Sequence, residues 1–440
     1  MKSNSCFKEF IKYTLLSIFG TLGVSCYIFT DTLFISMGMG ESGLTALNLA
    51  IPVYSLMYGF CVMMGVGGGT RYAIARGEGS AEKADGIFTS TLTAGLLVSF
   101  VFMAAGLLFS SPLARILGAD SAVFEMTDIY LKLLLSFTPA FLINNTMAGF
   151  VRNDGAPRLA MTATLTGSLS NVLLDYIFIF PLNMGMTGAV LATVLSPIIS
   201  ICVLSLHIIQ KHNNFHFRMK DVRFFTAISC AATGTSAFVN EVANAAVVIV
   251  FNLLILDLLG NTGVAAYGVI ANLAIVAVAV MSGISQGMQP IISRSYGEGN
   301  RLYIKRTLRY GIIFALALSA VIYGVILIFP EPITEIFNSE KSAELQGVAV
   351  NGLRLYFSAI PFAAFNIIIC NYFAAMKMAV QAAVISLLKG LLLLIPAAIL
   401  LSFLWGIDGV WLSYFAAEAV TAGVSLGLVI GFGRRNLLKS

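Results

Sequence analysis

The most restrictive feature of the sequence is a series of apolar runs, each about 20 residues long, that fill the chain from end to end. A helix of this length crosses the hydrocarbon core of a bilayer. The apolar residues do not alternate with a period of two, which argues against a membrane β-barrel. Charged residues make up only 11% of the chain, whereas soluble domains carry about 25%. We therefore expect an all-α integral membrane protein.

Short polar segments with turn-forming residues divide the chain into about twelve apolar spans that are long enough to cross a membrane. We expect them near residues 11–37, 47–75, 86–110, 127–151, 157–181 and 189–210, and then near 226–259, 264–292, 308–329, 347–376, 379–403 and 409–432. The predicted organisation is a first six-helix lobe at 1–212, a connector at 213–225 and a second six-helix lobe at 226–440. The two lobes are expected to surround a central cavity.

The two halves repeat each other. Gly77-Glu-Gly79 follows the second span and recurs as Gly297-Glu-Gly299 after the eighth, and residues 79 and 299 are 220 apart. Gly185-Met-Thr-Gly188 opens the sixth span, and Gly406-Ile-Asp-Gly409 opens the twelfth. Six spans per repeat give parallel, pseudo-symmetric lobes, a plan common among transporters that bind their substrate between two related bundles.

Positive charge gathers on one side of the expected membrane, as it does in cytoplasmic loops. The connectors on that side hold Lys2, Lys8, Lys12, Arg71, Arg76, Lys83, Arg152, Arg158, Lys211, Arg218, Lys220, Arg223, Arg294, Arg301, Lys305, Arg306, Arg309, Lys377, Arg434, Arg435 and Lys439. The opposite connectors hold only Arg115, Lys132, Lys341 and Arg354 among several acids. We expect a multi-pass protein of the cytoplasmic (inner) membrane with both termini in the cytoplasm.

A carboxylate lies inside the fifth span, in Asn171-Val-Leu-Leu-Asp175. Asn171 and Asp175 are one helical turn apart and share a face. An intramembrane acid costs about 2.5 to 3.5 kcal/mol on insertion scales, so it is a functional candidate by default. Asp175 lies about 9 Å from the outer end of its helix. Asp31 in the first span and Thr193 in the sixth are expected at a similar depth, which brings three helices to one level.

Two carboxylates, an amide, the Thr193 hydroxyl and the Ala189 carbonyl are hard oxygen ligands that suit a small hard cation. Sodium fits this set, and no other metal is expected. Two carboxylates in a low dielectric do not both ionise readily, so a proton could occupy the same place. A structural alternative stays open: Asp31 caps a helix end, while Asn171 and Asp175 hold helices together.

Glu241 is the deepest acid of the second half, and Asn244 follows it by one turn. It could bind a cation or a cationic substrate, or it could be paired with Lys389 inside the bundle. Glu418 in the last span is a weaker candidate. An offset of 220 places Phe251 opposite Asp31, so the second half does not duplicate the first site.

Several classes of function are excluded. The net charge of +5 is spread over short separated loops, with no basic stripe interleaved with aromatics for a nucleic acid. The spans contain no nucleophile with a base and no acid-rich metal motif, so we expect no enzyme and no cofactor. A phosphate-binding loop that would power a primary pump is also missing. The six cysteines and the three histidines have no metal-site spacing.

These residues resemble the multidrug and toxic compound extrusion (MATE) transporters and, within them, the MepA-like branch. The resemblance covers nearly the whole chain. It is carried by Thr30-Asp31-Thr32, by Gly65-Val-Gly-Gly-Gly69, and by Asn171-Val-Leu-Leu-Asp175 followed by Gly185-Met-Thr-Gly-Ala-Val-Leu-Ala-Thr193. It implies a cation site at Asp31, Asn171, Asp175, Ala189 and Thr193, of which Ala189 supplies its carbonyl.

The resemblance further implies an antiporter that exports hydrophobic, often cationic small molecules in exchange for Na⁺ or H⁺. We expect the protein to be a monomer in the lipid bilayer. Some relatives also carry coupling acids in the seventh and tenth helices. Glu241 matches the first of these, but the tenth span offers Asn366 and Asn371 and no acid. The alternative is a flippase for a lipid-linked precursor, which the cytoplasmic rather than intramembrane position of the basic residues disfavours.

Overall fold

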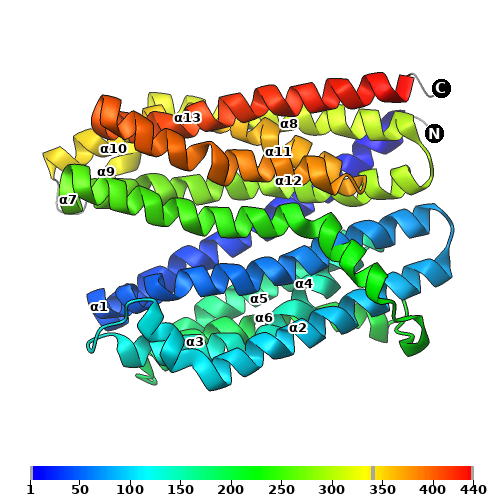
Figure 1. Cartoon of the computed structure of the whole chain (residues 1–440), viewed down its shortest axis with the longest axis horizontal. Helices are drawn as coiled ribbons and strands as arrows, with labels where there is room; N and C mark the ends of the chain where they lie inside the picture. The colour runs from blue at the N-terminus through cyan, green and yellow to red at the C-terminus, as the bar shows by residue number, and fades with distance from the viewer. Residues whose placement is uncertain (1–2, 338–341, 438–440) are drawn as a thin grey trace.

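The computed structural model describes residues 3–337 and 342–437, and within these ranges the chain folds into helices without a β-strand. Lys2, Lys341 and Lys439 lie outside the described residues. The two halves of the chain form two bundles that lie side by side (Figure 1). Seven described helices are long and apolar enough to cross a membrane, or up to nine if each of two bent pairs counts as one span. The expected all-α membrane fold is confirmed, and the protein is a multi-pass membrane protein.

All twelve predicted spans lie on helices, although the helix bounds differ from the predicted ones. The first bundle is built from α1 (Ser3–Gly77), α2 (Ala81–Ile116), α3 (Phe124–Ser136), α4 (Thr138–Asn153), α5 (Pro157–Ile179) and α6 (Gly185–Ile209). A short 3₁₀ turn, η1 (Met219–Asp221), lies in the connector. The second bundle is built from α7 (Phe224–Gly297), α8 (Arg301–Ile328), α9 (Pro330–Glu335), α10 (Ala343–Phe357), α11 (Ile360–Ala375), α12 (Ala379–Leu387), the π-helical turn η2 (Leu388–Leu392) and α13 (Leu394–Leu437).

Three long helices each contain a break at a single glycine. The 75 residues of α1 are far too many for one span, and Gly40 inside it has φ 64° and ψ −149°. Gly260 in α7 and Gly406 in α13 have similar values, with φ 59° and 58°. Glycine adopts positive φ at little steric cost, so each glycine ends one span and begins the next. The polar connectors that we predicted between these spans are therefore reduced to single glycines.

Two spans are bent. The span predicted at 127–151 is made of α3 and α4, which meet at 48°, and the span at 347–376 is made of α10 and α11, which meet at 43°. Pro139 and Pro361 lie in the first turn of the second helix of each pair. Proline has no N–H to donate to the preceding turn, so it interrupts the helical hydrogen bonds and permits the bend.

The backbone confirms the repeat of 220 residues. Gly79 and Gly299 both have positive φ, at 77° and 71°, and the next helices begin at Ala81 and Arg301. The bundles meet through closely packed glycines. A Cβ atom built on Gly67 would lie 1.9 Å from the carbonyl oxygen of Cys230, and one built on Gly234 would lie 2.0 Å from that of Met63. Only glycine permits this approach of α1 to α7.

The first turns of α1 pack in the second bundle. Phe10 belongs to the buried cluster that contains Ile284 and Ile368, and Arg294 donates to the carboxylate of Glu9 at 2.8 Å. The start of α7 lies in the first bundle in the same way, because Cys230 packs with Tyr72 and Phe88, and Arg71 donates to the carbonyl of Ser229 at 2.8 Å. Each half therefore holds the beginning of the other half's first helix. The division at residues 212 and 225 stays a prediction.

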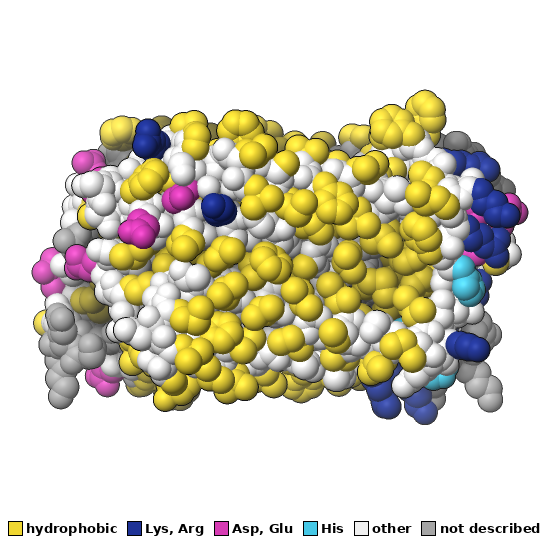
Figure 2. Space-filling model, turned by 90° about the horizontal axis from the view of Figure 1, so that it is seen from below, with side chains coloured by type: hydrophobic (Ala, Val, Ile, Leu, Met, Phe, Trp, Pro, Cys, Tyr) yellow, Lys and Arg dark blue, Asp and Glu magenta, His cyan; other side chains and the backbone are white. Residues whose placement is uncertain are grey.

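We call the end of the molecule that carries the first turns of α1, the last turns of α13 and most Lys and Arg the basic end, and the opposite end the acidic end. Figure 2 shows both ends, separated by a broad apolar belt on this face. Polar contacts join the two bundles toward the basic end. The pairs are Gln289 with Thr70 (2.6 Å), Arg152 with Gln286 (2.7 Å) and Lys377 with Glu78 (3.7 Å). A hydrogen bond from Lys83 and the charge of Lys377 lower the pKa of the Glu78 carboxyl.

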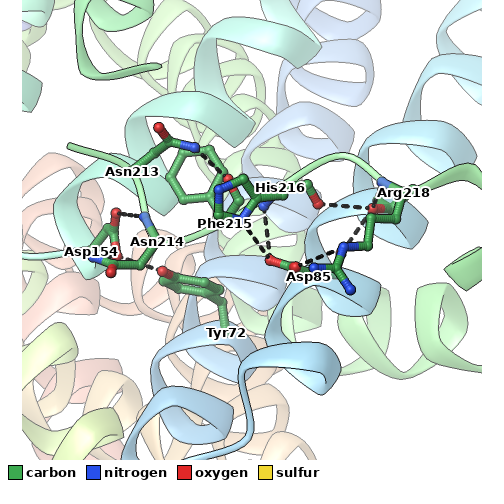
Figure 3. A network of polar contacts seen from close by, with 9 residues as sticks. Tyr72, Asp85, Asp154, Asn213, Asn214, Phe215, His216 and Arg218 are labelled. Carbon is green, nitrogen blue, oxygen red and sulfur yellow. Dashed lines mark hydrogen bonds and ion pairs between the residues drawn. The ribbon is translucent and has the colours of Figure 1, made fainter. Parts of the chain in front are cut away.

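The connector is held down by two buried carboxylates (Figure 3). Asp154 accepts hydrogen bonds from the Tyr72 hydroxyl and the backbone N–H of Asn214, and it contacts His207 Nε2 at 2.9 Å. Asp85 accepts from the backbone N–H of His216 at 2.8 Å, and its other oxygen contacts Arg218 Nε at 3.2 Å. The longest polar connector of the sequence is therefore a docked segment.

Replacing Asp154 by Ala is expected to release the start of the connector, because its buried donors then lose their acceptor, at a cost of about 1 to 3 kcal/mol each. Limited trypsin digestion of membranes that expose the basic end should then cleave near Lys211 at least several times faster than in the wild type. Asp120→Ala, at the acidic end, is the matched control and should leave this rate unchanged. Equal cleavage of Asp154→Ala and the wild type would contradict this role for Asp154.

Candidate cation site

The two predicted carboxylates meet inside the first bundle. Asp31 lies on the first part of α1 and Asp175 on α5, and their carboxyl groups lie next to each other. Asp175 is fully buried, whereas Asp31 is half-buried. The prolines at the start of α5 and after its end leave an uninterrupted helix over Pro157–Ile179, which holds Asn171 and Asp175 on one buried face.

Asn171 links the acid pair to α6. With its amide oriented to satisfy both neighbours, its nitrogen donates to Asp175 Oδ2 at 3.2 Å and its oxygen accepts from the backbone N–H of Thr193 at 3.3 Å. The Thr193 hydroxyl donates to the carbonyl of Ala189 at 3.1 Å. The structure thus brings Asp31, Asn171, Asp175 and Thr193 together. The Ala189 carbonyl adjoins them and accepts this hydrogen bond, and its role as a cation ligand stays a prediction.

Two tyrosines that the sequence reasoning missed complete the surroundings. Tyr130 on α3 lies beside Thr193 and interacts electrostatically with both acids. Tyr27, one helical turn before Asp31, lies beside Tyr54. Its spacing from Asp31 could have indicated Tyr27. No spacing signal could have indicated Tyr130, because only the folding of α3 against α6 brings it to the site.

The acid pair has unused capacity to bind a positive charge. Oδ1 of Asp31 and Oδ1 of Asp175 are both buried without a hydrogen-bond partner. Among the described residues no Lys, Arg or His forms an ion pair with either acid. Two adjacent carboxylates in a low dielectric need a proton or a cation to offset their repulsion. In the described part of the chain, no cluster of three His, Cys, Asp or Glu side chains offers a transition-metal site.

The acids of the second half occupy different places. Glu241 lies where α7 meets α1, with its Cβ 3.1 Å from a Cβ built on Gly59. Tyr27, Tyr54 and Tyr58 of the first half are its electrostatic neighbours. Asn244, one turn later, is exposed, and no hydrogen bond in the described residues joins it to Glu241. The structure therefore does not bring these two predicted residues into one polar site.

The alternative interpretation of Glu241 assumed that it pairs with Lys389. In the structure Lys389 instead interacts electrostatically with Glu418. Glu418 is buried, and its Oε2 accepts a hydrogen bond from Asn366 at 2.6 Å, while Ser425 donates to the other end of that amide at 2.9 Å. The π-helical turn η2 carries Lys389 and lies after α12. A pattern of apolar residues does not indicate which buried acid Lys389 lies near.

Comparison with known proteins gives the family. The MatE family model matches residues 17–177 and 236–400, so it covers most of the chain and part of both bundles. The chain belongs to the MATE family. This confirms the family to which the sequence motifs pointed, and MATE proteins are transporters of multidrug efflux rather than enzymes.

Two curated relatives of this MATE chain are multidrug export proteins called MepA. The protein of Staphylococcus haemolyticus is 24% identical over 436 residues, which cover 99% of this chain and 95% of that protein. The protein of Staphylococcus aureus is 23% identical over 437 residues, which cover 96% and 93%. The alignments run through both bundles and all predicted site residues lie within them.

Two solved structures share the fold. A MATE protein in complex with MaL6 superposes with a TM-score of 0.91 at 22% identity, covering 98% of this chain and 97% of that one. A multidrug resistance MATE transporter of the MOP superfamily in an outward-facing conformation also gives 0.91 at 22% identity, covering 98% and 96%. The arrangement of the helices is therefore that of MATE transporters.

Proposed function

We propose that this MATE chain is a secondary antiporter that exports hydrophobic, often cationic organic compounds in exchange for Na⁺ or H⁺. The observation that carries the proposal is the buried pair Asp31 and Asp175, which has two unpartnered oxygens and no cationic partner among the described residues. A purely structural pair would need a Lys or Arg, or a permanently bound proton, to offset its charge. In a reversible site for a small cation, no such side chain occupies the position beside the two carboxylates.

Each side chain has a role in this proposal. Asp31 and Asp175 supply the negative charge for one monovalent cation, and Asn171 and Thr193 supply neutral oxygens and hold the carboxylate of Asp175 in place. A bound cation draws α1 toward α5, whereas its loss lets the two carboxylates repel each other. Because Asp31 is on α1, which joins both bundles, the cation stabilises one arrangement of the bundles over the other.

The direction of transport follows from the proposed topology. The excess of Lys and Arg at the basic end supports a cytoplasmic location for that end, in a protein of the inner cell membrane. The bundles are joined at the basic end by glycine packing and by polar pairs such as Gln289 with Thr70. Substrate would enter a cavity between the bundles when these contacts open and leave at the acidic end when they close. The name of the MepA relatives, multidrug export proteins, supports efflux of small organic molecules.

Purified protein in liposomes that contain a fluorescent cationic dye tests the proposal. We expect dye flux under an imposed Na⁺ gradient at clamped pH, or under a pH gradient without Na⁺. When neither gradient is imposed, the flux should not exceed that of dye-loaded liposomes without protein. The gradient that drives the flux identifies the ion. Dye movement that responds to neither gradient would overturn the proposed antiport.

A further inference from the structure

The repeat exposes a difference between the two bundles at their basic ends. In the first bundle the start of α2 is covered by the connector: Asp85 binds His216 and Arg218, the Thr89 hydroxyl accepts from the N–H of Arg218 at 3.0 Å, and the Ser90 hydroxyl accepts from the N–H of Arg223 at 3.0 Å. Figure 3 shows how closely the connector follows this surface. This side of α2 is therefore occupied by the chain itself.

The equivalent surface of the second bundle has the opposite charge. An offset of 220 places Lys305 at the position of Asp85 and Arg309 at that of Thr89, on α8. Arg301, one turn before Lys305, extends the same row. Arg301, Lys305 and Arg309 are exposed, and within the described part of the chain their side chains make no hydrogen bond or ion pair. Arg306, next to Lys305, is half-buried and likewise makes no such contact there.

Exposed apolar side chains share this face of α8. Leu302 is 59% exposed and Ile313 is 55% exposed, and at 100° per residue both project to the same side of the helix as Arg309. Cations thus lie at the start of the helix, and exposed apolar residues continue along the same side toward the middle of the span. We call this surface, from Arg301 to Ile313, the α8 face.

We propose that the α8 face binds the headgroups of anionic phospholipids, with Arg301, Lys305 and Arg309 at the phosphates and Leu302 and Ile313 beside the acyl chains. Basic side chains next to a span attract anionic lipid headgroups, each contributing on the order of a few-fold in affinity. An acidic peptide would match the cations but not the exposed leucine and isoleucine. The chain's own segment after residue 433 carries Arg434, Arg435 and Lys439, and like charges exclude it as the occupant.

The test uses the full-length protein in neutral detergent micelles and measures its affinity for dioctanoyl phosphatidylglycerol and for dioctanoyl phosphatidylcholine. We expect the wild type to bind the anionic lipid about tenfold more tightly. Lys305→Gln with Arg309→Gln should lose most of this preference. Lys220→Gln with Arg223→Gln removes the same charge from the connector at the same end and should keep it.

Three outcomes would overturn the proposal. The first is equal affinity for the two lipids, and the second is an unchanged preference in the Lys305→Gln, Arg309→Gln variant. The third is tighter binding of a competitor, where inorganic phosphate would assign the α8 face to a free anion and an oligoglutamate peptide would assign it to an acidic protein. Both variants change exposed side chains, and gel filtration checks that each is folded. The assay needs no transport, so its result is independent of the proposed antiport.

Discussion

Replacing Asp175 by Asn is expected to abolish ion-coupled efflux while leaving the protein folded. The amide has the size of the carboxylate, and Asn171 can still contact one of its polar atoms, but the site loses half of its negative charge. Losing about 3 kcal/mol of interaction weakens the binding of a cation roughly 100-fold. Dye efflux from proteoliposomes under the driving gradient should fall to the level of empty liposomes. Asp31→Asn should behave in the same way, since the cation needs both charges.

Two controls separate loss of coupling from loss of structure. Asp257→Asn removes an exposed acid from α7 and should keep the wild-type rate. Exchange of labelled substrate across the membrane at equal concentrations, which needs no ion gradient, should persist in Asp175→Asn. Wild-type, gradient-driven efflux in both Asp31→Asn and Asp175→Asn would show that the acid pair is structural.

The second large effect is expected at the packing between the bundles. A Cβ on Gly234 would lie 2.0 Å from a backbone oxygen, which no side-chain rotation can relieve. Gly234→Ala should therefore force α1 and α7 apart and destabilise the protein by roughly 3 kcal/mol, seen as a lower thermal unfolding midpoint. Buried Cys230, beside this contact, should also react faster with a small maleimide.

Gly268→Ala is the matched control for this prediction, because Gly268 is in the same helix and a Cβ built there has nothing within 4 Å. Alanine is favoured over glycine inside a helix by about 1 kcal/mol, so this variant should be as stable as the wild type or more stable. An unchanged midpoint and unchanged Cys230 labelling in Gly234→Ala would mean that the α1 and α7 contact is not needed at this place.

Local patterns were sufficient for the parts of the molecule that depend on composition and short spacing. The helical spans follow from apolar length, and the repeat follows from two pairs of glycine motifs that recur about 220 residues apart. Asp31, Asn171, Asp175 and Thr193 were predicted to meet because each lies at a countable distance from the end of its own helix. Depth along a helix is a local quantity, so the sequence contains it.

Features that depend on how distant elements pack were not predictable in this way. Tyr130 reaches Thr193 because α3 folds against α6, and Lys389 on η2 interacts electrostatically with Glu418 on α13. The turns at Gly40, Gly260 and Gly406 need a backbone angle that glycine permits but does not require. The docking of the connector depends on Asp85 and Asp154, which are distant from it in sequence and look like ordinary loop acids.

The glycine packing between the bundles has one more consequence, which concerns symmetry. Gly67 lies against Gly234, and their counterparts at an offset of 220 are Gly287 and Thr14, which also lie against each other. The contact surface therefore maps onto itself, as the interface of a two-fold homodimer does. The first turns of α1 and of α7, each of which packs in the other bundle, are related by the same two-fold pseudo-symmetry. The interface geometry is thus one that two identical six-helix subunits could form by swapping their first turns, with no connector between them.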